Sequence, residues 1–109
     1  MNFDEYQKQA SKFAVYESVY YPFFGIAEEV GEFVGLYAKL ERGDDINKRF
    51  GSEAGLREAF MKEAGDILWQ LSQCLEELGL SMQDVAEMNL KKLEDRQQRG
   101  VLRGFGDNR

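Results

Sequence analysis

Apolar residues recur every three or four positions along most of the chain, a spacing that predicts helices. The first helix is predicted over residues 3–19, where the recurring positions are Phe3, Tyr6, Ala10, Phe13 and Ala14. Pro22 suits the first turn of a helix, so a second helix is predicted over residues 22–40. Its apolar face consists of Phe23, Ile26, Ala27, Val30, Phe33, Val34 and Tyr37.

The rest of the chain is read as a loop, two further helices and a tail. Residues 42–55 are polar and contain three glycines, which predicts a loop with room for a short turn. The third helix is predicted over residues 55–78, with Gly79 as its C-terminal cap. Ser81 followed by Asp84 indicates the capped start of a fourth helix that runs to about residue 96. Residues 99–109 are predicted to form a loop. The apolar stripe of the third helix consists of Phe60, Ala64, Ile67, Leu68, Leu71, Leu75 and Leu78.

No segment shows the alternation of a strand, so the predicted fold class is all-α. We expect a single domain, residues 1–109, built as a bundle of about four helices. A chain of this length buries only about 60–70% of the surface of its unfolded form. A partner subunit would add stability, and the bundle is therefore expected to be completed by homo-oligomerisation.

Composition excludes several kinds of chemistry. The chain has no histidine, which removes Ser-His-Asp relays, His-ligated zinc and Glu-x-x-His di-iron sites. The single cysteine, Cys74, cannot form an intrachain disulfide and is expected in the core. Twenty acidic and fourteen basic residues give a net charge of -6, which argues against a general nucleic-acid-binding surface. No signal peptide or membrane-spanning run is recognisable, so the expected location is the cytoplasm.

Two segments share the pattern acid, apolar, glycine, acid, apolar, apolar: residues 29–34 and residues 63–68. On a helical wheel, Glu29 and Glu32 lie along the same edge of their apolar stripe as Glu63 and Asp66 do on theirs. The two acids of each pair are one turn apart, about 4.5 Å along the axis. Antiparallel packing of the two stripes would therefore bring four carboxylates together.

Converging carboxylates repel one another, and hard divalent cations such as Mg²⁺ relieve that repulsion. Gly31 and Gly65 each precede the second acid of a pair and cost a helix up to about 1 kcal/mol. This matching cost suggests close backbone approach or room for a bound group. Glu28 faces the polar side and is a candidate for orienting water. The alternative interpretation is that all these acids are solvated groups on helix edges.

Asn89 lies within the apolar stripe of the fourth helix, with Lys92 and Arg96 within about a third of the wheel from it. Asn, Lys and Arg on one face suit phosphate oxygens. Together with the acids they favour a metal-bound polyphosphate. The alternative is a buried structural asparagine beside cations whose stems cover apolar surface. The chain has no GxxxxGK[ST] loop, and without histidine the attacking water must be activated by a metal or a glutamate.

Three segments resemble the all-α nucleoside triphosphate pyrophosphohydrolases of the MazG type: AEEVGE at 27–32, EAGD at 63–66 and NLKKLEDRQQRG at 89–100. The family hallmark, EExxE followed by ExxD, is matched by Glu28, Glu29, Glu32, Glu63 and Asp66. Residues 21–22 (YP) and 106–109 (GDNR) are also similar, so the resemblance covers about residues 20–109. Thirty residues separate Glu32 from Glu63, which is long for the family, and the excess falls in the 42–55 loop.

The resemblance implies hydrolysis of (deoxy)nucleoside triphosphates to the monophosphate and pyrophosphate, with Mg²⁺ as cofactor and Mn²⁺ as a substitute. It implies a catalytic part for Glu28 and Glu29 and helical homodimers or homotetramers with sites near subunit interfaces. The implied metal ligands are Glu29, Glu32, Glu63 and Asp66. The implied phosphate contacts are Asn89, Lys92 and Arg96, with Phe24 or Trp69 against the base.

Two other classes of function remain open from the sequence. One is a non-catalytic helical module that binds a protein partner through its apolar stripes. The other is a nucleic-acid-associated regulator that uses the arginines of the tail, which the net charge disfavours.

Overall fold

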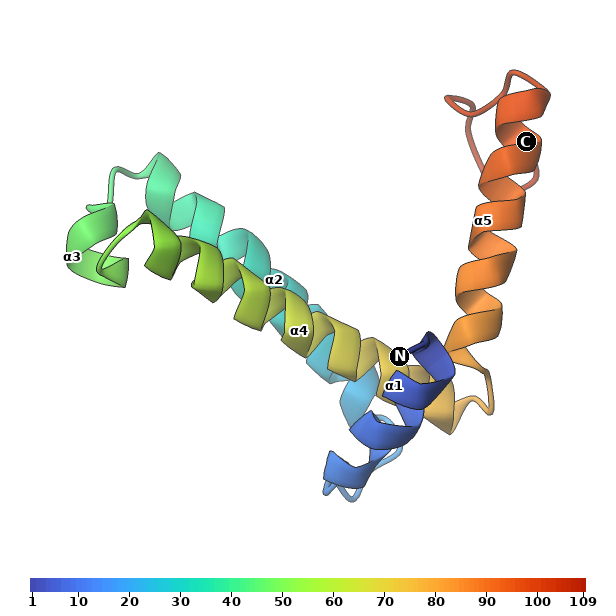
Figure 1. Ribbon diagram of the computed structural model, residues 1–109, viewed down its shortest axis with the longest axis horizontal. Coiled ribbons are helices and arrows are strands. Elements are labelled where there is room, and N and C mark those ends of the chain that lie inside the picture. The colour runs from blue at the N-terminus through green and yellow to red at the C-terminus, as the bar shows by residue number, and fades with distance from the viewer.

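The computed structural model describes residues 1–109 as five α-helices and one 3-10 turn, with no strand. The helices are α1 (Phe3–Ala10), α2 (Tyr21–Glu41), α3 (Ile46–Phe50), α4 (Glu53–Glu77) and α5 (Met82–Gln98), and the 3-10 turn is η1 (Ser11–Phe13). The prediction of an all-α fold is confirmed. Figure 1 shows α2 and α4 running side by side in opposite directions, with α3 at the far end of the pair.

Two close contacts define how α2 lies against α4. Toward α3, the rings of Phe33 and Phe60 meet edge to face, with centroids 5.6 Å apart. Two turns back along α2, the backbone at Gly25 lies directly against the side-chain amide of Gln70, which is only 4% exposed. A methyl group added at Gly25 would lie 2.5 Å from that amide. These contacts therefore bring Glu29, midway between them, opposite the segment of α4 that lies between Phe60 and Gln70.

The ends of α3, α4 and α5 follow from local capping chemistry. Asp45 accepts a hydrogen bond from the backbone N–H of Lys48 and so begins the short α3 within the predicted loop. Gly79 has a φ of 69° just after α4, a left-handed conformation that glycine adopts without strain. The Ser81 hydroxyl accepts from the N–H of Asp84 at 3.1 Å, which confirms the predicted start of the next helix.

The predicted helix over residues 3–19 is wrong beyond Phe13. The indole N–H of Trp69 donates to the carbonyl of Ala10 at 3.0 Å, and the Ser11 hydroxyl donates to the carbonyl of Gln7 at 2.8 Å. The N–H of Ala14 then bonds to Ser11, which is the spacing of a 3-10 turn. The carbonyl of Ala10, which would accept from the N–H of Ala14 if the α-helix continued, thus bonds to Trp69 instead, and the α-helix ends there.

Buried amides and hydroxyls attach α1 to the rest of the chain. The Gln7 amide donates to the carbonyl of Leu80 at 2.9 Å and accepts from the N–H of Met82 at 2.8 Å. Gln73 donates to the hydroxyl of Ser11 at 3.4 Å. These bonds fix the turn between α4 and α5, and Cys74 is buried beside them as expected.

The chain is open rather than closed into a bundle. In Figure 1, α5 projects away from the α2–α4 pair, and α1 is the helix with which it packs. The radius of gyration is 17.3 Å, whereas about 13 Å is typical of a domain of this length. The accessible surface is 8299 Å², which exceeds the roughly 6,200 Å² of a compact monomer of this mass. The expected four-helix bundle therefore does not close within one chain.

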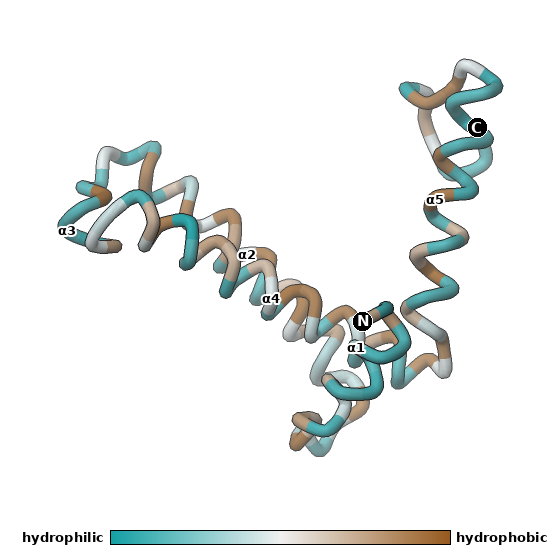
Figure 2. The backbone as a smooth tube through the Cα atoms, viewed as in Figure 1, coloured by the Kyte–Doolittle hydropathy of each residue, from teal (hydrophilic) through white to brown (hydrophobic).

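Much of the apolar surface is uncovered as a consequence. Only 12 of 109 residues are buried, and Tyr37 on α2 and Met88 on α5 are 62% and 74% exposed. Figure 2 shows apolar positions along α2 and α4 and also along the projecting α5. Within a single chain the apolar face of α2 is only partly covered, since Phe23, Val30 and Val34 are exposed as well. No helix is both long enough and apolar enough to cross a membrane.

The close contact at Gly25 gives a first prediction. Gly25→Ala should lower the free energy of unfolding by about 1 kcal/mol, because the buried end of the Gln70 side chain must move aside for the new methyl group. Gly31→Ala is the control: no atom lies within 4 Å of the position its methyl group would take, so it should stabilise by about 0.5–1 kcal/mol. Urea unfolding measures both, and equal effects of the two variants would contradict this packing.

Candidate metal centre

Three carboxylates converge between α2 and α4. Glu29 comes from α2 and Glu63 and Asp66 come from adjacent turns of α4, and one carboxylate oxygen of each lies within 4.8 Å of the others. Glu29 and Glu63 are half-buried, while Asp66 is exposed. Their convergence follows from the antiparallel register of the two helices, which places Glu29 opposite both acids of the ExxD segment.

The cluster has no counter-charge within the chain. None of the three carboxylates takes part in an ion pair. Burial raises the pKa of Glu29 above its ordinary value, and the charges of Asp66, Glu63, Glu32 and Glu28 raise it further. A group of acids that is packed together and left without a cation is electrostatically unfavourable unless a cation binds there.

The donor set fits a hard divalent cation. All three groups are carboxylates, the oxygen ligands that Mg²⁺ and Ca²⁺ prefer. With Mg–O distances near 2.0–2.1 Å, opposite ligands of an octahedral shell lie about 4.2 Å apart. Oxygens within 4.8 Å of one another need only small side-chain rotations to reach such an ion.

The other acids of the two motifs lie nearby but outside this group of three. Glu32 and Glu28 are both exposed on α2, and both act on Glu29 through their charge. Two roles were open for the glycines of the motifs, a close backbone approach or room for a bound group, and the structure rules out the first within one chain. No atom of the chain lies within 4 Å of a methyl group built at Gly31 or Gly65, so neither marks a close backbone approach. The close approach lies at Gly25 instead.

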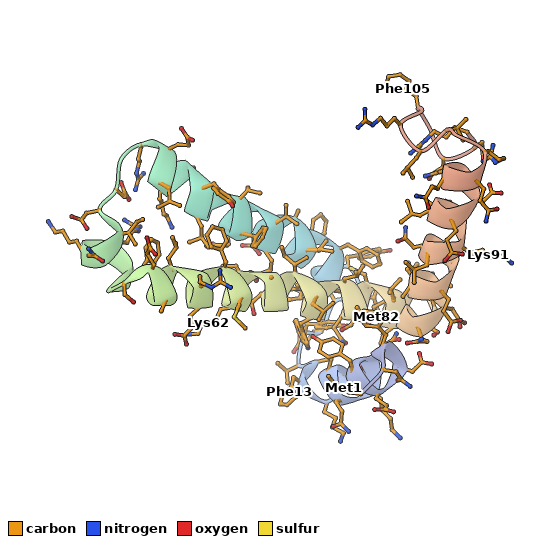
Figure 3. The ribbon with its side chains drawn as sticks, turned by 45° about the horizontal axis from the view of Figure 1, so that its top comes forward. Met1, Phe13, Lys62, Met82, Lys91 and Phe105 are labelled. Carbon is orange, nitrogen blue, oxygen red and sulfur yellow. The ribbon has the colours of Figure 1, made fainter.

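The basic residues predicted for phosphate binding lie elsewhere in the chain. Asn89, Lys92 and Arg96 are on α5, which does not pack on the α2–α4 pair. Figure 3 shows this separation: Lys62, next to Glu63, is on α4, and Lys91, next to Lys92, is far away on α5. A single chain therefore does not bring the predicted phosphate contacts to the carboxylates.

The tail supplies an anion to those cations. Asp107 accepts hydrogen bonds at its side chain from Lys92 and Arg96, both at 3.2 Å, and at its carbonyl from Arg96 at 2.7 Å. The hydrogen bonds and charges of these two cations lower the pKa of Asp107. Arg96 is buried, and its Nε has no partner. Asn89 on the same helix is exposed, so it is not a buried structural asparagine within one chain.

The structure adds a residue that the sequence did not single out. Tyr6 of α1 has its pKa raised first by burial and then by the charge of Asp66, so the two groups interact electrostatically. In the sequence, Tyr6 was one of several regularly spaced apolar positions, with no signal that α1 would cross α4 near the acids. Of the two predicted base contacts, Trp69 is half-buried and bonded to Ala10, whereas Phe24 is 74% exposed.

The fold and the carboxylate cluster together define a class: an all-α protein with an acidic centre between two antiparallel helices. Within that class the chain belongs to the MazG nucleotide pyrophosphohydrolase family, whose domain it matches over residues 23–101. It is also similar to the Gene 37 protein of Mycobacterium phage L5, with 32% identity over 120 aligned positions that span the whole of both chains. No solved structure matches it.

The unpaired charge of the cluster gives a second prediction. Glu29→Gln should raise the melting temperature of the metal-free protein, because it removes one of three mutually repelling groups. The pKa of Glu29 is raised in the folded protein, so its charged form opposes folding at neutral pH. This opposition declines as pH falls below the raised pKa and is gone below the ordinary pKa of a glutamate. The advantage of the variant should therefore shrink on mild acidification.

Added MgCl₂ should raise the melting temperature of the wild type and have a much smaller effect on Glu29→Gln. The control is Glu94→Gln, which removes an exposed charge of α5 and should respond to MgCl₂ as the wild type does. Equal responses of all three proteins to MgCl₂ would contradict a metal site at the cluster.

Proposed function

We propose that the protein hydrolyses a (deoxy)nucleoside triphosphate to the nucleoside monophosphate and pyrophosphate in the cytoplasm, with Mg²⁺ as cofactor and Mn²⁺ as a substitute. The observation that carries the proposal is the convergence of Glu29, Glu63 and Asp66 without a counter-charge from the chain. Membership of the MazG nucleotide pyrophosphohydrolase family supports the same substrate class.

Each acid has a distinct part in this proposal. Glu29, Glu63 and Asp66 hold the metal from two helices whose spacing is fixed by packing. Glu32 acts on Glu29 through its charge and completes the ligand set from the next turn of α2. Glu28 is exposed next to Glu29 and acts on it through its charge, and in this proposal it orients the attacking water and takes up its proton.

The reaction is cleavage of the anhydride between the α and β phosphates. The water oxygen forms a bond to the α-phosphorus, the bond between that phosphorus and the bridging α–β oxygen breaks, and pyrophosphate leaves with the bridging oxygen. Bound Mg²⁺ would neutralise phosphate charge and lower the pKa of water. The chain's own part is to hold the carboxylates in place before substrate arrives, so that little reorganisation is needed during the reaction.

The basic groups of α5 reach the triphosphate from a second copy of the chain. The separation of α5 from the carboxylates within one chain supports this arrangement, as does the large uncovered apolar surface. We propose a homodimer or homotetramer in which Asn89, Lys92 and Arg96 of one copy contact phosphates held at the carboxylates of another. A phosphate that binds there replaces Asp107 as the partner of the two cations.

A non-catalytic protein-interaction module is the second candidate. The exposed apolar positions of α2 and α5 favour it, since uncovered apolar surface of this extent marks an interaction site. The interaction-module hypothesis does not explain why the unpaired carboxylates converge. Turnover of a nucleotide distinguishes the two candidate functions directly.

Turnover is the third prediction. Incubation with Mg²⁺ and a panel of dNTPs and NTPs should yield the monophosphate and pyrophosphate, resolved by anion-exchange chromatography. Glu63→Gln should reduce kcat more than about 100-fold while leaving the helical circular dichroism unchanged, because loss of a direct ligand costs more than loss of an outer group. Orthophosphate as the first product would contradict the cleavage site, and activity retained by Glu63→Gln would contradict the metal assignment.

Sharing of the site between copies is the fourth prediction. Glu63→Gln and Arg96→Gln should each be inactive alone. If the carboxylates and the cations of one site come from different copies, mixing the two unfolded variants and refolding them together should restore part of the activity. Refolding Glu63→Gln with Asp66→Asn is the control, because both changes lie in the same half of the site. No recovery in the first mixture, with both variants folded, would contradict the shared site.

A further inference from the structure

An aromatic pocket lies between the segment that follows η1, the start of α2 and the middle of α4. Its volume is about 370 Å³, within the usual range for small-molecule sites. The lining residues are Val15, Tyr16, Glu17, Ser18, Tyr21 and Trp69. Three aromatic rings and a single charged group form the wall, which is the composition of a site for a flat, partly polar ring system.

The aromatic walls are held in place by bonds at their polar atoms. The hydroxyl of Tyr16 donates to Glu77 at 2.9 Å, and the indole N–H of Trp69 donates to the carbonyl of Ala10 at 3.0 Å. The rings of Tyr16 and Tyr21 stack with centroids 5.6 Å apart and planes 22° apart. Because the polar ends of two of these side chains are already bonded, it is their apolar rings that line the pocket.

The pocket and the carboxylate cluster are at different positions along the length of the α2–α4 pair. Trp69 follows Asp66 by three residues, so the two side chains are neighbours on the surface of α4. Tyr21 precedes Glu29 by eight residues, about 12 Å along α2. In the opposite direction the space between α2 and α4 is filled by Phe33, Tyr37 and Phe60, whose rings contact one another. Along the axis of the helix pair, the space for a flat ring therefore lies on the Tyr21 and Trp69 side of the cluster.

Glu17 is the group that can form a hydrogen bond with a polar substituent of a bound ring. It is exposed and makes no hydrogen bond or ion pair within the chain. Ser18, in contrast, is engaged in the turn before α2, where its hydroxyl accepts from the N–H of Tyr20. A carboxylate only accepts hydrogen bonds at neutral pH, so it suits an exocyclic amino group and repels a carbonyl oxygen.

We propose that this pocket holds the nucleobase of the substrate, stacked on Tyr21 and Trp69, with Glu17 accepting a hydrogen bond from an exocyclic amino group. The substrate class is then a nucleoside triphosphate with adenine, guanine or cytosine, in preference to uracil or thymine. This inference rests on the proposed function for the identity of the ligand. It also separates the two base contacts suggested by the sequence, since Trp69 lines the pocket and Phe24 does not.

Binding can be measured without turnover, because Trp69 is the single tryptophan of the chain. Titration of the metal-free protein with AMP, GMP, CMP and UMP should quench its fluorescence saturably, with UMP the weakest ligand. Tyr21→Leu should weaken this binding, and raise KM for the triphosphate, by roughly 5- to 100-fold, the range for loss of one base–aromatic stack. Tyr21→Phe should bind as the wild type does, because the ring and not the hydroxyl lines the stack.

Tyr20→Leu is the matched control. Tyr20 is the neighbouring aromatic residue, is 66% exposed and lines a different pocket, so its replacement should leave binding and KM unchanged. Glu17→Gln should reduce the preference for amino bases over UMP, because an amide both donates and accepts. Unchanged binding by Tyr21→Leu, or equal binding of UMP and the other nucleotides by the wild type, would overturn the proposal.

The failure of this inference is distinguishable from that of the proposed function. Turnover of triphosphates with a KM that Tyr21→Leu does not alter would overturn the pocket assignment and leave the hydrolase intact. Saturable, Tyr21-dependent binding of nucleotides without turnover of any triphosphate would support the base pocket and contradict the hydrolase.

Discussion

The antiparallel contact between α2 and α4 determines where every acid of the proposed centre lies. The register is set by Phe33 against Phe60 on one side and by Gly25 against Gln70 on the other. Between these contacts, Glu29 has no position other than opposite Glu63 and Asp66. The packing thus holds together carboxylates that repel one another, and part of the stability gained from the helix contact is offset by that repulsion. A cation bound among the three carboxylates would relieve this repulsion, and metal binding would then add to the stability of the folded chain.

The openness of the chain is the second constraint. α5 leaves the helix pair, and apolar residues on α2 and α5 remain exposed although they have the spacing of a core face. The α5 cations meanwhile pair with Asp107 of the tail instead of with the acids of the cluster. Both observations have one explanation if a second copy covers the apolar faces and brings its cations to the carboxylates. The carboxylates of one copy and the cations of the other would then form one site, and the exposed apolar residues would form the interface between the copies.

The sequence predicts much of this fold because its signals are local. Helical periodicity placed α2, α4 and α5 to within two residues, and Gly79 and Ser81 marked helix ends through their own backbone preferences. The matching phase of the ExxE and ExxD segments predicted that acids of two helices would meet. What failed depends on distant partners: α1 ends early because Trp69 bonds to Ala10, and the apolar face of α2 is left uncovered because α5 packs elsewhere. Neither partner is identifiable from residues near in sequence.

The aromatic pocket shows the same limit of sequence reasoning. Tyr16 belongs to a segment predicted to be helical, and Tyr21 lies between two predicted helices. The turn after η1 brings their rings together beside Trp69. The recurring glycines of the motif, Gly31 and Gly65, predict either a close approach or room for a bound group, whereas the close approach of the structure is at Gly25. A motif indicates which chemistry is present, and the tertiary contacts decide which neighbouring residues take part.

The most direct test of the central claim is the position of the metal. Crystals grown with Mn²⁺ and a nucleotide whose α–β bridge cannot be hydrolysed would locate each ion by anomalous scattering. We predict an ion coordinated by Glu29, Glu63 and Asp66, with the triphosphate bound to it. Ions found only at other acidic groups such as Asp44 and Asp45, with the three carboxylates uncoordinated, would contradict the account.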